Sequence, residues 1–83
     1  SGDDFFKVFP NPTSGDFTLE LSSEPEGSVV TVQLYNLLGG LIQDRELESG
    51  RSHHFTLVNQ CPGLYIIKVS GNGKSGMQKI VRQ

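Results

Sequence analysis

Apolar and polar side chains alternate with a period of two along three stretches of the chain. The stretches are DFTLEL at 16–21, VVTVQLY at 29–35 and LYIIKV at 64–69. Because successive side chains of a β-strand point to opposite faces, this pattern predicts strands with one buried face. The side chains that we expect in the core are Phe17, Leu19, Val30, Val32, Leu34, Tyr65, Ile67 and Val69.

Weaker β patterns occupy most of the remaining chain. They are FFKVF at 5–9, LIQDREL at 41–47, SHHFTL at 52–57 and SGMQKIVR at 75–82. Turn-forming residues separate the segments, and Asn72-Gly73 predicts a two-residue hairpin turn because both residues tolerate positive φ. No segment repeats apolar residues with a helical period, so we expect essentially no helix. About seven short strands predict an all-β, immunoglobulin-like antiparallel β-sandwich.

The stretch VFPNPTSGDF at 8–17 concentrates turn chemistry ahead of a strand. Pro10 and Pro12 cannot donate to a sheet ladder, and each biases the residue before it to extended geometry. Gly15 can adopt positive φ at no steric cost. The stretch therefore predicts a rigid, non-helical corner that delivers the chain into a strand at Asp16.

Length and cysteine content limit the architecture. A chain of 83 residues makes one small domain, and its single cysteine excludes an intramolecular disulfide. No apolar run is long enough for a transmembrane helix, and we expect no signal peptide in the first residues. Ser1-Gly2 resembles a cloning remnant, so we expect a fragment of a longer protein. We expect residues 1–5 to be linker and remnant, residues 6–83 to be one domain, and the domain to be a monomer.

Charge is distributed unevenly along the chain. The net charge is −2, yet all nine acidic side chains lie within residues 1–50, where Lys7 and Arg45 are the only bases. Residues 64–83 contain no acid and carry four bases, Lys68, Lys74, Lys79 and Arg82. This asymmetry fits either a solvated strand face or a surface that orients a partner. It does not predict nucleic-acid binding, because no aromatic residues are interleaved with these bases.

Residues that could carry chemistry do not form a catalytic or metal-binding pattern. His53 and His54 are neighbours, so on a strand they point to opposite faces and cannot chelate one metal. We expect one half-buried and one exposed imidazole. Cys61 lacks an indicated base and pocket, and GNGKS at 71–75 lacks the glycine and the helix of a phosphate-binding loop. The acidic residues have no calcium-loop spacing and predict a solvated edge: Glu24, Glu26, Asp44, Glu46 and Glu48. We expect no enzyme activity and no cofactor.

An ordered set of motifs carries a resemblance to a known family. VFPNPTSGDFTLEL is followed by VTVQLYNLLGGLI and then by CPGLYIIKVSGNGKSGMQKIVRQ. This combination resembles the C-terminal sorting domain of the type IX secretion system of Bacteroidota, also called the Por secretion system (type A family). The resemblance covers about residues 6–83. Phe9 replaces a common tyrosine and Asn36 a common aspartate, and neither change alters the expected turns, because Asn and Asp both form them.

The resemblance implies a secretion address at the end of a larger exported protein. It implies recognition by outer-membrane components of the type IX machinery, then removal by a sortase-like peptidase, with transit through the periplasm to the cell surface or the medium. We also expect no direct membrane span, because no apolar run approaches the length of a transmembrane helix. The motif residues that the resemblance carries over as a partner-recognition set are Pro10, Asn11, Pro12, Gly15, Gly39 or Gly40, Pro62, Gly63, Tyr65, Lys79, Ile80 and Val81, to which we add Arg82.

Two interpretations accompany this resemblance. The corner after Phe5-Phe6 would separate a cleavable linker from the folded signal. The two bases Lys79 and Arg82 would matter for export, with at least one of them at a solvated edge. The alternative function is an immunoglobulin-like spacer or an adhesion or carbohydrate-binding module, for which Tyr35 is the plausible aromatic platform.

Overall fold

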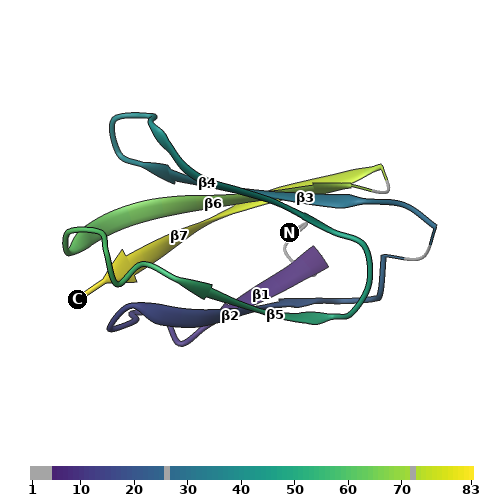
Figure 1. Cartoon of the computed structure of the whole chain (residues 1–83), viewed down its shortest axis with the longest axis horizontal. Coiled ribbons are helices and arrows are strands. Elements are labelled where there is room, and N and C mark those ends of the chain that lie inside the picture. The colour runs from purple at the N-terminus through teal and green to yellow at the C-terminus, as the bar shows by residue number, and fades with distance from the viewer. Residues whose placement is uncertain (1–4, 26, 72) are drawn as a thin grey trace.

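The computed structural model describes residues 5–25, 27–71 and 73–83. Expectations about Ser1-Gly2, Glu26 and Asn72 therefore lie outside the described residues. Within these described residues the elements are seven strands in chain order: β1 (Phe6–Phe9), β2 (Asp16–Leu21), β3 (Val30–Asn36), β4 (Leu41–Leu47), β5 (Ser52–Thr56), β6 (Gly63–Gly71) and β7 (Lys74–Arg82). Figure 1 shows them as two layers of strands.

The layers are two antiparallel sheets of unequal size. One contains three strands in the order β1-β2-β5, and the other contains four in the order β4-β3-β6-β7. In a constant-type immunoglobulin domain the fourth strand joins the sheet of the first two. Here β4 instead pairs with β3 along Val30↔Leu47 and the following residues. The all-β antiparallel sandwich is confirmed, and its strand order is a variant of the immunoglobulin arrangement.

The core lies between the two sheets and is made by the inward side chains of every strand. All the side chains expected from the three strongest patterns are buried, from Leu19 and Ile67 at 0% exposure to Tyr65 at 6%. The weaker strands add Phe6, Val8, Leu47, Phe55 and Ile80. The rings of Phe17 and Phe55 stack across the β2–β5 pair with centroids 5.5 Å apart.

One long side chain joins the open edges of the two sheets. Arg45 of β4 places its guanidinium 4.0 Å from the centre of the Phe55 ring on β5. Its Nη1 also donates to the His54 carbonyl at 2.8 Å. A cation over an aromatic ring is attracted by the ring quadrupole. Because Arg45 donates a hydrogen bond to an outward-facing carbonyl of edge strand β5, that carbonyl is less available for pairing with a strand of another chain.

Candidate recognition surface

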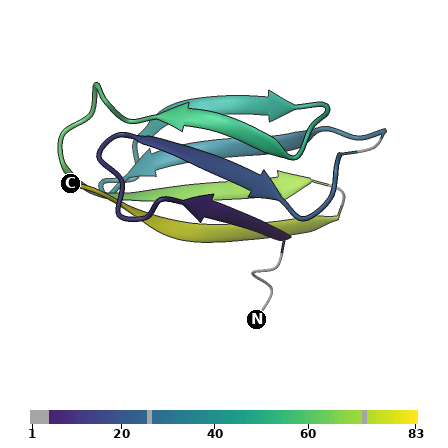
Figure 2. The ribbon, with the colours of Figure 1, turned by 90° about the horizontal axis from the view of Figure 1, so that it is seen from below.

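The motif segments of the sequence converge on one end of the sandwich. The pairing register aligns Asn36 with Tyr65 and Tyr65 with Ile80, so the end of β3, the start of β6 and the end of β7 are adjacent. Thr13 of the β1–β2 loop forms a parallel bridge with Arg82. Figure 2 shows the loops and the C-terminus together at this end. We call it the motif end.

The PNP loop, residues 10–15, is attached to the outer edge of β7. Asn11 Nδ2 donates to the Lys79 carbonyl at 2.7 Å, and Asn11 Oδ1 accepts from the Val81 N–H at 3.0 Å. The Thr13 N–H donates to the Val81 carbonyl, and the Gln83 N–H donates to the Thr13 carbonyl, both at 2.8 Å. A side-chain amide and a short backbone segment thus continue the sheet beyond its last strand.

The position of this loop corrects one sequence-based interpretation. The corner delivers the chain into a strand at Asp16, as expected. It does not separate a linker from the folded signal, because β1 precedes it and pairs with β2 along Phe6↔Leu21 to Phe9↔Thr18. The two prolines end the strand pairing, but the residues before them form strand β1. This strand contributes Phe6 and Val8 to the core. The peptide bonds Phe9-Pro10 and Asn11-Pro12 are both cis.

Thr13 and Gly15 fix the inner side of the PNP loop. Thr13 is 1% exposed, and its hydroxyl donates to the Asp16 carbonyl and accepts from the Gly15 N–H. Gly15 has a φ of 146°, and a Cβ there would lie 2.8 Å from Cγ1 of Val58. Gly15 also accepts a hydrogen bond from the Leu57 N–H. The residue type indicates that Thr13 can hydrogen-bond the local backbone, which the structure confirms, but Thr13 is absent from the motif set that the resemblance carries over.

The β3–β4 turn is built on the side chain of Asn36. Its Oδ1 accepts from the N–H groups of Leu38 at 3.0 Å and Gly40 at 2.8 Å. Gly39 has a φ of 86°, the left-handed conformation that glycine adopts without strain. A carboxylate oxygen could accept the same two hydrogen bonds. Asparagine therefore forms the turn at a position where aspartate is common, as expected.

The segment Cys61–Tyr65 forms a tyrosine corner. Tyr65 is buried in β6, and its hydroxyl donates to the carbonyl of Cys61 four residues earlier. Sandwich domains use this contact to hold the connection that leads into the penultimate strand. Pro62 and Gly63 lie exposed between the two partners. Cys61 is a free, exposed cysteine.

The last strand divides its side chains as its alternation predicts. Ile80 is fully buried, Lys79 and Val81 are exposed, and Arg82 is half-buried on the side of Ile80. Arg82 Nε donates to the Leu57 carbonyl at 2.8 Å, which ties β7 to the loop after β5. One base, Lys79, therefore lies at a solvated edge as expected, and the other holds the fold together.

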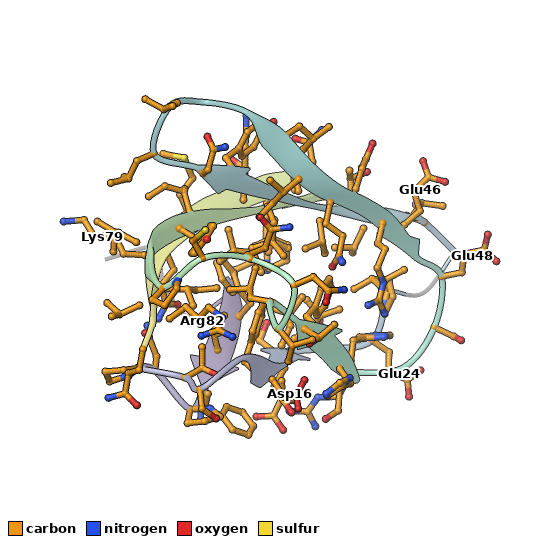
Figure 3. All side chains as sticks on the ribbon, turned by 60° about the vertical axis from the view of Figure 1, so that its left-hand side comes forward. Asp16, Glu24, Glu46, Glu48, Lys79 and Arg82 are labelled. Atoms are coloured by element: carbon orange, nitrogen blue, oxygen red, sulfur yellow. The ribbon has the colours of Figure 1, made fainter. Side chains whose placement is uncertain are left out.

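Charges are segregated around the sandwich rather than across the motif end alone. In Figure 3, Lys79 lies on the side of β7, and Glu46 and Glu48 lie on the opposite side of the view. The two glutamates belong to the far end of the sandwich, because the pairing of Leu47 with Val30 places them beside the start of β3. His54 is exposed and its Nε2 lies 3.6 Å from the Asp16 carboxylate. His53 is half-buried and its Nε2 contacts the Gly50 carbonyl at 2.9 Å, so the two imidazoles diverge as expected. The described residues contain no group of three or more His, Cys, Asp or Glu side chains arranged for a metal ion.

Comparison with known proteins decides the family. Residues 7–83 match the family described as "Secretion system C-terminal sorting domain". The chain belongs to this family. The sorting domain of this chain is thus a C-terminal signal for type IX secretion, and the family is a signal family rather than a catalytic one. Such a domain interacts with the secretion machinery and accompanies proteins exported to the cell surface or secreted.

One relative shows the setting in which such a sorting domain occurs. The "Ulvan lyase NLR42" of Nonlabens ulvanivorans is 37% identical over 65 residues, which are 78% of this chain and 12% of that protein. The chain thus spans a small fraction of the relative's length. In the part of this chain that the structure describes, no helix is long and apolar enough to cross a membrane.

Proposed function

We propose that this domain carries a larger protein through the type IX machinery, from the periplasm across the outer membrane. The observation that carries the proposal is the family match over residues 7–83, which spans all seven strands except the first residue of β1. The match to 12% of an ulvan lyase supports a much longer cargo for domains of this kind. The cargo of this chain would be a secreted or surface protein.

We further propose that a sortase-like peptidase removes the domain on the N-terminal side of β1. A cut before Phe5 leaves every strand intact. A cut within β1 would remove Phe6 or Val8 from the core, where they are 5% and 7% exposed. Since proteases act on exposed, locally unfolded chain, this difference supports a boundary near residues 5 and 6.

The motif residues would act as a folded surface rather than as a linear signal. Gly15, Tyr65 and Ile80 are buried, so they would affect recognition through the shape that they maintain. Exposed members of the set are available for direct contact: Pro10, Pro12, Gly39, Pro62, Gly63, Lys79 and Val81. The side chains of Asn11 and Arg82 form hydrogen bonds with the backbone of the domain itself, so we assign them a positioning role.

The test is a periplasmic reporter fused in front of the domain in a host with the type IX machinery. We expect reporter at the surface or in the medium, with a mass that lacks the domain and a new C-terminus before Phe6. A fusion truncated after Lys74 should stay inside, because it lacks Ile80 and the partners of Asn11 and Thr13. Exported reporter that retains the whole domain would contradict removal, and equal export of the truncated fusion would contradict recognition of a folded domain.

A further inference from the structure

The outer face of the four-stranded sheet carries apolar side chains where a solvated face would be polar. On β6 the side chains alternate between the two faces. The inner face buries Tyr65, Ile67 and Val69, so Leu64 and Ile66 face outward. On β7 the buried Ile80 leaves Met77 and Val81 facing outward, with exposures of 69% and 40%. We call Leu64, Ile66, Met77 and Val81 the outer strip.

The pairing register makes the outer strip continuous. Leu64 lies opposite Val81, Ile66 lies opposite Lys79, and Lys68 lies opposite Met77. Directly opposite residues on one face of an antiparallel pair have neighbouring side chains. Ile66, Met77, Gln78 and Lys79 line a shallow groove at this place. The strip and its two lysines thus form one surface that reaches the motif end.

The other sheet shows that the fold does not require such a strip, because its outward positions are polar apart from Phe9 at the end of β1, which is 45% exposed. Outward positions of β2 and β5 are polar along their length: Asp16, Thr18, Glu20, Ser52, His54 and Thr56. An antiparallel sheet with one solvated face normally has this polar pattern. A contiguous apolar surface rimmed by polar groups marks an interaction site on soluble domains. The asymmetry between the two sheets therefore points to a partner for the larger one.

The charges at the rim specify the chemistry of that partner. Lys68 and Lys79 are exposed beside the strip, and neither β6 nor β7 contains an acidic residue. The acidic side chains of the same sheet, Asp44 and Glu46, lie on β4, two strands away from β6. A partner that presents carboxylates around apolar side chains complements the β6–β7 side, and such complementarity favours encounter and register.

We propose that the outer strip, with Lys68 and Lys79, is the surface by which the domain docks on the secretion machinery. The occupant is a machinery component that presents apolar side chains bordered by carboxylates. This inference rests on the proposed export function. It differs from recognition of Lys79 and Arg82 as a basic pair, because Arg82 lies on the inner side of β7 and bonds the Leu57 carbonyl.

The test compares two double variants in the reporter fusion. Met77→Glu/Lys79→Glu alters the outer strip, and Val29→Glu/Lys74→Glu is the matched control. Val29 is 43% exposed and Lys74 is exposed, and both lie near Gly71, away from the motif end. Both variants have the same change in charge. We expect surface reporter to fall about tenfold or more for the first variant, because carboxylates would then face carboxylates, and to stay within about twofold for the control. The conservative variant Met77→Leu/Lys79→Arg should retain export.

Folding and self-association are measured on the purified domains. Both glutamate variants should unfold cooperatively within a few degrees of the unmodified domain, and all should sediment as monomers. Equal export of the strip variant and the control, with the unmodified domain exporting, would overturn the docking surface and leave the export function standing. A dimer of the unmodified domain that the strip variant abolishes would make a second copy the occupant and would also overturn it. No export of the unmodified domain would remove the export function and this surface together.

Discussion

Asn11 and Val81 are separated by 70 positions in the sequence, and the Val81 N–H donates to Asn11 Oδ1 at 3.0 Å. The same amide donates to the Lys79 carbonyl, so one side chain engages two consecutive outward-facing backbone groups of β7. An unpaired strand edge is a template for unwanted pairing. The PNP loop covers this edge and links the start of the domain to its last strand.

Removal of the Asn11 amide should destabilise the domain without changing its core. Asn11→Ala loses two hydrogen bonds, and we expect a decrease of about 1–2 kcal/mol in the free energy of unfolding. Chemical denaturation of the purified domain measures it. Ser14→Ala is the control, since Ser14 is exposed in the same loop and should change stability by less than ~0.5 kcal/mol. Equal stability of the two variants would show that the amide contacts contribute nothing.

Gly15 and Gly39 should respond differently to alanine. Both have positive φ, but a Cβ at Gly15 would lie 2.8 Å from Val58 Cγ1, whereas a Cβ at Gly39 meets nothing within 4 Å. We expect Gly39→Ala to cost about 1–2 kcal/mol from backbone strain, and Gly15→Ala to cost a further 1–3 kcal/mol, roughly, from overpacking. Urea denaturation measures both, and Gly15→Ala/Val58→Ala should recover part of the difference. Identical costs at the two glycines would contradict the close approach.

The alternation of side chains was sufficient to predict the strands and their buried faces. A period of two is set by the backbone itself, so DFTLEL at 16–21 gave the bounds of β2 and its three core residues. The predicted segment 75–82 starts one residue later than β7, because Lys74 and the preceding Gly73 have low β-propensity. Lys74 belongs to the strand because it pairs with Gly71 of β6 in the hairpin. Such strand ends depend on the pairing partner and not on the local sequence alone.

Long-range contacts of the motif end could not be predicted from local pattern. The sequence indicated that Asn11 forms a turn, but its partners lie on β7 and depend on how the two sheets pack. Alternation places Lys79 and Arg82 on opposite faces of β7, but the hydrogen bond from Arg82 to the Leu57 carbonyl depends on how the loop after β5 packs. The assignment of β4 to the larger sheet likewise depends on its pairing with β3, which alternation alone does not encode.

The two tyrosines allow a matched test of the tyrosine corner. Tyr65 is buried and bonds the Cys61 carbonyl, whereas Tyr35 is half-buried and bonds the side chain of Gln33 on its own strand. Tyr65→Phe removes the hydrogen bond to the Cys61 carbonyl, which is partly buried, and should lower the free energy of unfolding by about 1–2 kcal/mol. Tyr35→Phe should cost less than about 0.5 kcal/mol. Thermal unfolding of both variants measures the difference, and a larger loss for Tyr35→Phe would contradict the assignment.

The face assignment of β2 is tested by truncation of one core side chain. Leu19 is 0% exposed, so Leu19→Ala should cost roughly 2–4 kcal/mol through lost burial and a residual cavity. That is a large part of the total of about 5 kcal/mol expected for a small domain. Glu20→Ala, at the next position on the opposite face, is the control. A melting temperature within a degree or two of the unmodified domain for Leu19→Ala would contradict the assignment.

Export by this domain is tested by surface display of a reporter in two matched hosts. A periplasmic reporter fused to residues 3–83 is expressed in one host with an intact type IX machinery and in one that lacks its outer-membrane translocon. Protease accessibility on whole cells measures the displayed fraction, and the fusion truncated after Lys74 serves as the misfolded control. We expect display of the unmodified fusion in the intact host only, and retention of the truncated fusion in both hosts. Display of the unmodified fusion in both hosts, or in neither, would contradict this expectation.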